Sequence, residues 1–395
     1  MNVGHIAARL IAFVIDGVDA DFIKNTEIDH EELYQFAKAH SIGNIICIAL
    51  KQLNIMPPQY ESFYEKLYKI LCAQEATQEI EKQEIVCELE RLGIKHMLLK
   101  GSVMKHLYPS PELRSMCDID ILYDTAYISE LNQMMLDRGY TLVEVTGSRG
   151  KNIAYVLSPF VRIEFHGVLM DRDIPRYNRY FGENFERTVP VCGTQVRFSD
   201  EDFFVFMVAH IAKHYFIGGT GIRSLADIWL FLRKKPDLDM DSVRSKLREI
   251  ELEEFADIII GVNGVLFDGN EPTPLQSEVI EYIFNSGTYG TVNNRAAENV
   301  KETSKFGYVL KRLFPDREFM SVNYPAVKKC VLLLPLFWLI RLVSVALKKG
   351  YKGSDIDLVM RLEASQIDAR KIPGNPFEKE NSQTRKEGTE DDKKS

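Results

Sequence analysis

Two aspartates separated by a single residue, Asp118 and Asp120, are the first candidates for chemistry in this chain. Ile119 and Ile121 alternate with them in the text Asp-Ile-Asp-Ile. On an extended strand, side chains two residues apart share a face, roughly 6.6 Å from one another, so both carboxylates project together while the isoleucines pack into a core. Neighbouring carboxylates repel each other unless a cation lies between them, and divalent cations favour oxygen ligands. The pattern therefore predicts a metal site on a strand.

A third acidic residue, Glu164, lies in a second alternating segment, Val-Arg-Ile-Glu-Phe-His at 161–166. The period of two places the apolar residues on one face and Arg162, Glu164 and His166 on the other. Glu164 would complete a set of three metal-binding carboxylates. Arg162 would either bind phosphate or balance the charge of Glu164, and the sequence favours neither role.

A phosphate-binding turn is indicated upstream by Lys100-Gly101-Ser102, where a strand would end and a helix begin. The first turn of a helix offers unpaired N–H groups and the positive end of a dipole to phosphate oxygens. Taken alone, Gly101-Ser102 is more typical of a simple turn. Lys100 and Arg114 are candidate counter-charges, although a lysine before a turn is commonly just solvated.

The alternative for the aspartate pair is a solvated strand end without any metal, because aspartate pairs are common in loops. Glu164 downstream and Arg114 nearby make the metal site the better interpretation.

Together these motifs resemble the nucleotidyltransferase superfamily, which shares a fold with DNA polymerase beta and kanamycin nucleotidyltransferase. Its members carry a Gly-Ser or Gly-Gly turn, an Asp-x-Asp or Asp-x-Glu strand, and a third acid on a neighbouring strand. The chain is most similar to a poorly characterised bacterial family with Leu-Lys-Gly, an Arg before Asp-Ile-Asp-Leu-like text, and a later acid-aromatic-His strand. The resemblance runs from the first helices to about Leu347. The gap between Gly101 and Asp118 is longer than in many members.

The resemblance implies a reaction in which an acceptor oxygen attacks the α-phosphorus of a nucleoside triphosphate, expected to be ATP, and pyrophosphate leaves. The acceptor would be a hydroxyl or similar group on a small molecule or a protein. The implied cations are Mg²⁺ or Mn²⁺, and their ligands, which are also the catalytic residues, would be Asp118, Asp120 and Glu164. The implied nucleotide-binding or pocket-lining residues are Lys100, Gly101, Ser102, Arg114, Arg162, His214, Arg223 and Asp227.

Two other functional classes stay open. The chain could be a catalytically silent nucleotide-binding or assembly module, or a phosphotransferase that moves the γ-phosphoryl group. His210 and His214, four residues apart on a predicted helix, would also suit zinc. The text His-Ile-Ala-Lys-His lacks the glutamate of a zinc-protease motif, so paired core or groove-lining histidines are the favoured interpretation.

Composition limits the partners. A chain of 395 residues exceeds what one core usually holds, and 45% hydrophobic with 27% charged residues is typical of a soluble globular protein. A formal net charge of −8 argues against nucleic-acid binding, which normally needs a basic face. The expected partners are a nucleoside triphosphate and a small-molecule or protein acceptor.

Cysteine usage and the N-terminus predict the compartment. The six cysteines show no Cys-x-x-Cys spacing, which favours thiols in a reducing compartment. Cys117 is expected to face away from the aspartates, since it adjoins Asp118. Residues 1–16 lack the basic start and cleavage site of a secretory signal, so we expect a cytoplasmic protein.

The periodicity predicts an α+β fold with helical regions on both sides of a small sheet-forming segment. The resemblance implies that this segment is a mixed-sheet nucleotidyltransferase domain. We expect a helical N-terminal region at 1–92, the catalytic domain at 93–198, a helical C-terminal region at 199–372 and a disordered tail at 373–395. Expected strands are 95–99, 119–123, 141–145, 153–157, 161–166 and 189–198.

Two helical segments carry specific expectations. In the segment 61–92, one apolar stripe is predicted to contain Phe63, Leu67, Ile70 and Leu71. The segment 331–347 begins with an apolar run of ten residues, short of the roughly 20 needed to span a bilayer. A buried helix pair is expected there, and contact with a membrane surface is the less favoured alternative.

Overall fold

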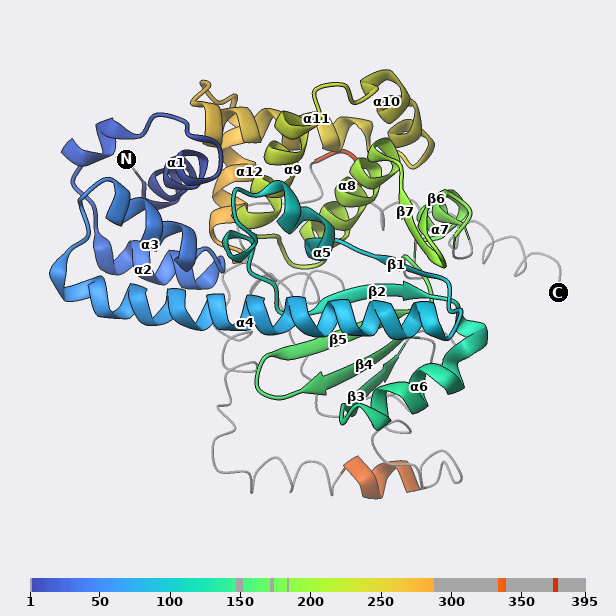
Figure 1. The fold of residues 1–395 in the computed structure, drawn as a ribbon. Coiled ribbons are helices and arrows are strands. Elements are labelled where there is room, and N and C mark those ends of the chain that lie inside the picture. The colour runs from blue at the N-terminus through green and yellow to red at the C-terminus, as the bar shows by residue number, and fades with distance from the viewer. Residues whose placement is uncertain are drawn as a thin grey trace.

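The structure, a computed structural model, describes residues 2–146, 152–170, 174–182, 185–287, 333–338 and 372–375. Four helices precede the first strand, namely α1 (Val3–Asp16), α2 (His30–Ala39), α3 (Gly43–Gln52) and α4 (Pro58–Arg91). A mixed sheet follows, and further helices come after it (Figure 1). The predicted α+β class is therefore confirmed.

Helix α4 is the longest element, with 34 residues that extend from the N-terminal helices to the sheet (Figure 1). Pro58 occupies its first turn, where a fixed φ is favourable, and Gly93 follows its end with φ +70°. The predicted apolar stripe is wrong in part, because Phe63 and Ile70 are 55% and 42% exposed. Helix α4 packs on α3, and Tyr34 of α2 lies against Phe63 and Tyr64 of α4.

The sheet has seven strands in the order β3-β4-β5-β2-β1-β7-β6. Their bounds are β1 His96–Leu98, β2 Ile119–Tyr123, β3 Thr141–Thr146, β4 Asn152–Leu157, β5 Val161–His166, β6 Thr188–Cys192 and β7 Gln195–Phe198. Strand β2 is parallel to β5 and β1 is parallel to β7, whereas the other neighbours are antiparallel. The single strand predicted over 189–198 is instead the β6–β7 hairpin, which turns at Gly193 with φ +52°.

The two faces of the sheet differ in chemistry. Alternate residues of β2 and β5, including Ile121, Ile163 and Phe165, pack in a core beneath the end of α4 and helix α6 (Ile128–Asp137). The intervening residues face the rest of the helical body. Leu122 of β2, for example, belongs to the large core that the helices share. The predicted alternation therefore places apolar residues on one face and the acids on the other.

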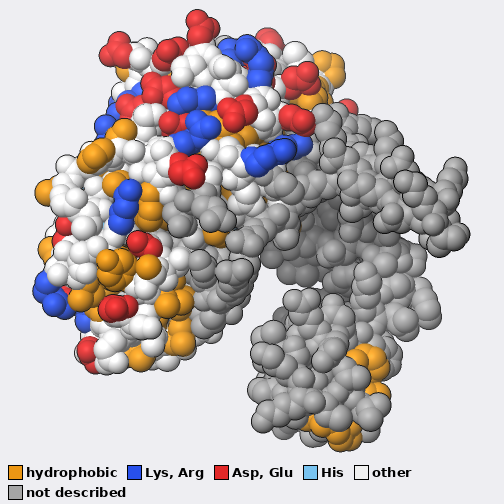
Figure 2. All heavy atoms as spheres, turned by 90° about the vertical axis from the view of Figure 1, so that its right-hand side faces the viewer, with side chains coloured by type: hydrophobic (Ala, Val, Ile, Leu, Met, Phe, Trp, Pro, Cys, Tyr) orange, Lys and Arg blue, Asp and Glu red, His pale blue; other side chains and the backbone are white. Residues whose placement is uncertain are grey.

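The later helices are α8 (Asp200–Ile217), α9 (Ile222–Lys234), α10 (Met240–Glu249), α11 (Glu253–Asn263) and α12 (Pro274–Phe284), with α7 (Pro175–Phe181) before β6. Ser199 caps α8 by accepting a hydrogen bond from the backbone N–H of Asp202. Helices α8 to α12 share one hydrophobic core with α1 to α3. Charges of both signs are interspersed over the upper part of the face in Figure 2. Ion pairs join neighbouring helices, as where Arg244 on α10 lies 2.8 Å from Asp257 on α11.

Some predictions fall largely outside the described residues. These include most of the 331–347 segment, the disordered tail apart from 373–375, and much of the C-terminal region between 288 and 371. Within the described ranges, no helix combines the length and the apolar character needed to cross a membrane. The five described cysteines, 47, 72, 87, 117 and 192, are free.

The buried ring of His40 joins both helical regions. Its Nε2 lies 3.1 Å from the carbonyl oxygen of Phe284, and its Nδ1 accepts the N–H of Ile222 at 3.3 Å. Burial lowers the pKa of His40 to about 4 from an ordinary value of 6.5.

We expect the His40→Gln variant to resist acid better than the wild type, relative to each protein's stability at pH 8. Below pH 6.5 the unfolded chain binds a proton at His40 that the folded chain does not, so stability falls as the pH falls from 6.5 towards 4. The wild type should lose about 2 kcal/mol more than the variant between pH 8 and pH 5. Urea unfolding at both pH values measures this, and equal losses would contradict the prediction.

Candidate functional site

The site is built on the parallel pairing of β2 with β5. In this register Asp120 is the partner of Glu164, and Leu122 is the partner of His166. Asp120, Glu164 and His166 consequently project from adjacent strands on the same face. The sequence pattern predicts each strand's alternation, and the register brings the two sets of polar residues together.

Asp120 is only 5% exposed, and its carboxylate contacts the ammonium group of Lys100 and the imidazole of His166. Lys100 Nζ lies 2.8 Å from its Oδ1, and Nε2 of His166 lies 2.6 Å from the same oxygen. Burial alone would raise the pKa of Asp120, but Lys100 and the hydrogen bond with His166 hold it well below its usual range. Asp120 is therefore ionised, and Lys100 supplies its counter-charge.

Asp118, just before β2, has the opposite electrostatics. Burial and the neighbouring Asp120 carboxylate raise the pKa of Asp118 to about 6, and Glu164 contributes in the same direction. Lys100 and Arg223 oppose this shift without cancelling it. The ionised form of Asp118 is thus unfavourable in this environment, as expected for an acid placed among other acids.

A group of potential metal ligands forms around Asp120. One ligand atom from each of Asp120, Glu164 and His166 lies within 4.8 Å of the other two. The predicted set contained Asp118 in place of His166; Asp118, two residues before Asp120, lies outside this group but lines a cavity together with Asp120 and Glu164. Glu164 additionally accepts a hydrogen bond from Arg162 Nε at 2.8 Å, so Arg162 balances its charge.

The predicted phosphate turn is built around an unusual backbone. Lys100 ends the segment after β1 with φ +47° and ψ −119°, a conformation that costs a non-glycine residue about 1–3 kcal/mol and is concentrated at functional sites. Gly101 begins the short helix α5 (Gly101–Met104), and a Cβ there would come within 2.6 Å of the Met116 sulfur. Gly101 lines the cavity, whereas the side chain of Ser102 is buried below it with 1% exposure.

Arg114 is occupied by a carboxylate. Its Nε and Nη2 donate to both oxygens of Asp227 on α9, at distances from 2.7 to 3.0 Å, and Tyr108 donates to Asp227 as well. Arg114 and Arg223 both donate to the carbonyl oxygen of Ser115. Removing one partner of such a buried pair typically costs about 3–5 kcal/mol. The pair therefore anchors the segment before Asp118 to α9.

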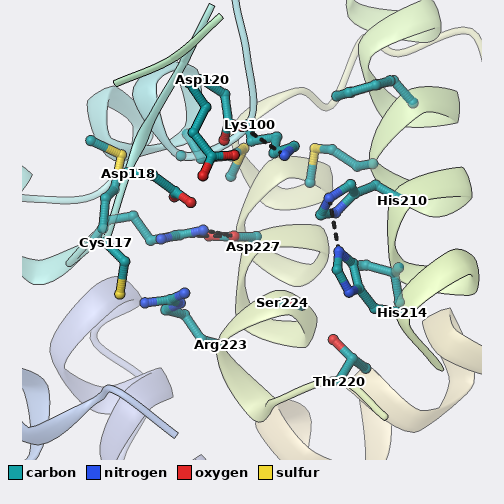
Figure 3. A pocket seen from close by; sticks show the side chains of 18 residues that line it. Lys100, Cys117, Asp118, Asp120, His210, His214, Thr220, Arg223, Ser224 and Asp227 are labelled. Carbon is teal, nitrogen blue, oxygen red and sulfur yellow. Dashed lines mark hydrogen bonds and ion pairs between the residues drawn. The ribbon is translucent and has the colours of Figure 1, made fainter. Parts of the chain in front are cut away.

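These elements enclose a cavity of about 240 Å³ between the sheet and helices α8 and α9. Figure 3 shows Asp118, Asp120 and Lys100 on one side and His210 and His214 across from them. The two imidazoles lie 3.1 Å apart through their Nε2 atoms, and burial, with Lys100 nearby, holds the pKa of His210 well below its usual value. The histidine pair thus lines a groove, which is the favoured interpretation of its spacing.

Most of the predicted binding residues meet at this cavity. Those that line it are Lys100, Gly101, Arg114, Asp118, Asp120, Glu164, His214, Arg223 and Asp227. Sequence reasoning did not assign a site role to His166, although it shares the face of Glu164 two residues earlier. The expectation that Cys117 faces away is wrong, because this exposed residue precedes the strand and lines the cavity too.

The protein therefore has an α+β fold with a candidate cation site on one face of a mixed sheet. Residues 26–268 match the model of a family described as uncharacterised nucleotidyltransferase. The match covers more than half of the chain, which therefore belongs to this nucleotidyltransferase family. Comparison with curated proteins and with solved structures finds no match.

The two aspartates should have opposite effects on stability in EDTA at pH 8. The folded state binds a proton at Asp118 more tightly than the unfolded state, so the wild type loses stability as the pH rises from 4 to 6. Asp118→Asn removes this loss and should raise the free energy of unfolding by on the order of 1–3 kcal/mol. Asp120→Asn should lower it, because Lys100 and His166 lose their partner. Urea unfolding measures both, and two shifts of the same sign would contradict this electrostatic account.

Proposed function

We propose that the protein transfers a nucleoside monophosphate from a nucleoside triphosphate, with ATP as the expected donor, to a hydroxyl or similar group on a small molecule or protein. The observation that carries this proposal is the in-register pairing of Asp120 with Glu164 at the wall of a cavity in a nucleotidyltransferase family member. Asp118 adds a third carboxylate to the same wall. The sheet thus supplies the acids that such a transfer needs.

The residues suit a divalent cation, Mg²⁺ or Mn²⁺. Asp118, Asp120 and Glu164 provide hard oxygen ligands. Burial raises the pKa of Asp118, and the carboxylate of Asp120 raises it further, a repulsion that a cation would relieve. In the structure the ammonium group of Lys100 provides the positive charge beside Asp120. When bound, divalent cations lower the pKa of the acceptor hydroxyl and neutralise charge on the departing pyrophosphate.

In the proposed reaction the acceptor oxygen forms a bond to the α-phosphorus, and the bond from that phosphorus to the β-phosphate oxygen breaks. Pyrophosphate carries away the electron pair of the broken bond. Glu164 is the proposed acceptor of the hydroxyl proton, because it has the most solvent access of the three ligand-bearing residues on β2 and β5. Its hydrogen bond from Arg162 fixes its orientation.

The nucleotide would lie along the cavity from the acids towards α9. Gly101 lines the cavity and is the proposed backbone contact for phosphate, and its missing Cβ makes room for the Met116 side chain. Lys100 and Arg223 are the proposed phosphate counter-charges, whereas Arg114 acts by holding Asp227. His214 would contact the base or the acceptor.

The double variant Asp118→Asn, Asp120→Asn should lose nucleotidyl transfer by at least about a thousandfold while remaining folded, because the proposed mechanism depends on both carboxylates. ATP is incubated with the protein, Mn²⁺ and hydroxyl compounds, with water as a slow acceptor. Phosphorus NMR measures the products after the paramagnetic Mn²⁺ has been removed on a chelating resin. The wild type should release pyrophosphate with AMP or an AMP ester. Release of ADP would instead identify a γ-phosphoryl transferase, and metal-dependent ATP binding without any product would identify a silent binding module.

Replacing Lys100 should separate metal binding from nucleotide binding. Lys100→Met removes a positive charge 2.8 Å from Asp120, so affinity for Mn²⁺ alone should rise several-fold, while affinity for a non-hydrolysable ATP analogue should fall about tenfold. Calorimetry measures both, and Lys95→Met, an exposed lysine outside the cavity, is the matched control. If the affinities for Mn²⁺ and for the ATP analogue change in the same direction, the idea that Lys100 moves from the Asp120 carboxylate to a phosphate group is wrong.

A further inference from the structure

His166 is the residue at the candidate cation site that lies outside the three-carboxylate pattern. Its Nε2 lies 2.6 Å from Asp120 Oδ1, and both atoms lie within 4.8 Å of a Glu164 carboxylate oxygen. The His166 side chain is 19% exposed and projects from β5 on the same face as Glu164, two residues away. An imidazole nitrogen is thus built into the same small volume as two carboxylates.

We propose that His166 is a direct nitrogen ligand of the divalent cation, and that the site therefore prefers a transition metal of the Mn²⁺ type over Mg²⁺. This inference rests on the proposed function for the presence of a cation, and goes beyond it in naming a ligand and a metal class. Asp120 and Glu164 supply the oxygen ligands of the same ion.

The geometry requires only a small rearrangement. Two ligands about 2.1 Å from one ion, on adjacent octahedral positions, lie about 3 Å apart, close to the separation of His166 Nε2 and Asp120 Oδ1. The hydrogen bond between these two atoms would be replaced by two bonds to the ion, with the imidazole proton on Nδ1. Lys100 would leave Asp120 Oδ1, since the ion takes over its charge-balancing role.

The ligand set determines the preference. Mg²⁺ favours oxygen ligands and strict octahedral geometry, whereas imidazole nitrogen suits first-row transition metals, for which affinity rises along the series from Mn²⁺ to Cu²⁺. A site of two carboxylates and one imidazole should accordingly discriminate between Mn²⁺ and Mg²⁺ more than an all-carboxylate site would. The competing role for His166 is purely positional: it would orient Asp120 by a hydrogen bond and never touch the ion.

Electron spin-echo measurements on Mn²⁺ bound to the full chain separate these roles, because they detect nitrogen coordinated to the ion. Wild type should show an imidazole nitrogen signal, and His166→Gln should lose it. Glutamine keeps an N–H donor for Asp120, so the positional role is preserved while the nitrogen ligand is removed. His106→Gln, at an exposed site, and His210→Gln, across the cavity, should both retain the signal.

Calorimetry with Mn²⁺ and Mg²⁺ provides the second readout. His166→Gln should weaken Mn²⁺ binding at least about tenfold and Mg²⁺ binding less, so that the preference ratio shrinks. Circular dichroism tests whether each variant is folded. If His166→Gln is not folded, His166→Asn takes its place.

Each outcome bears on one level of the proposal. If the wild type binds Mn²⁺ without a nitrogen signal, and Asp120→Asn no longer binds Mn²⁺, the His166 assignment is overturned and the proposed function stands. Loss of the signal in His210→Gln instead of His166→Gln overturns it as well. Mn²⁺ affinity that is unchanged in Asp120→Asn removes the cation site itself, and with it the proposed function.

Discussion

The charge of Asp120 is the constraint on which the site depends. Its carboxylate is almost fully buried yet ionised, and an isolated charge in such a place would be strongly unfavourable. Lys100 meets this requirement from the turn after β1 and His166 from β5, and both reach the same carboxylate oxygen. Both contacts require the observed register between β2 and β5 and the observed backbone conformation after β1. The charge balance of Asp120 therefore depends on the local fold.

The neighbouring elements serve that arrangement. Lys100 reaches Asp120 from a backbone with positive φ, and Gly101 follows because Met116 occupies the space where a side chain would stand. The chain between them and Asp118 is then held from the helical side by the Arg114–Asp227 pair. Strain at one residue is thus compensated by packing and by a buried ion pair, which is the usual relation between a functional site and its scaffold.

Much of this arrangement can be predicted from sequence, for a physical reason. Alternation along a strand is a local property, so the faces of Asp120 and Glu164 follow from their neighbours. The register between β2 and β5 is not local, and neither is the Arg114–Asp227 pair, whose members are 113 residues apart. Alternation also fails where the strand has not begun, as Cys117 demonstrates. An apolar residue such as Phe63 can repeat at helical spacing and still remain 55% exposed, although the ring of Tyr34 lies beside it.

The charges that remain at the cavity also constrain how a triphosphate would bind there. On the sheet side, Asp120 is paired with Lys100 and Glu164 with Arg162, so the charge of Asp118 is added to a wall whose own cations are already engaged. The charge of Arg114 is neutralised by Asp227. A nucleotide with several negative charges would be repelled from this wall until positive charge is added. On the proposed function, divalent cations must therefore enter before or together with the triphosphate, and the release of Lys100 from Asp120 would then make its ammonium group available to phosphate.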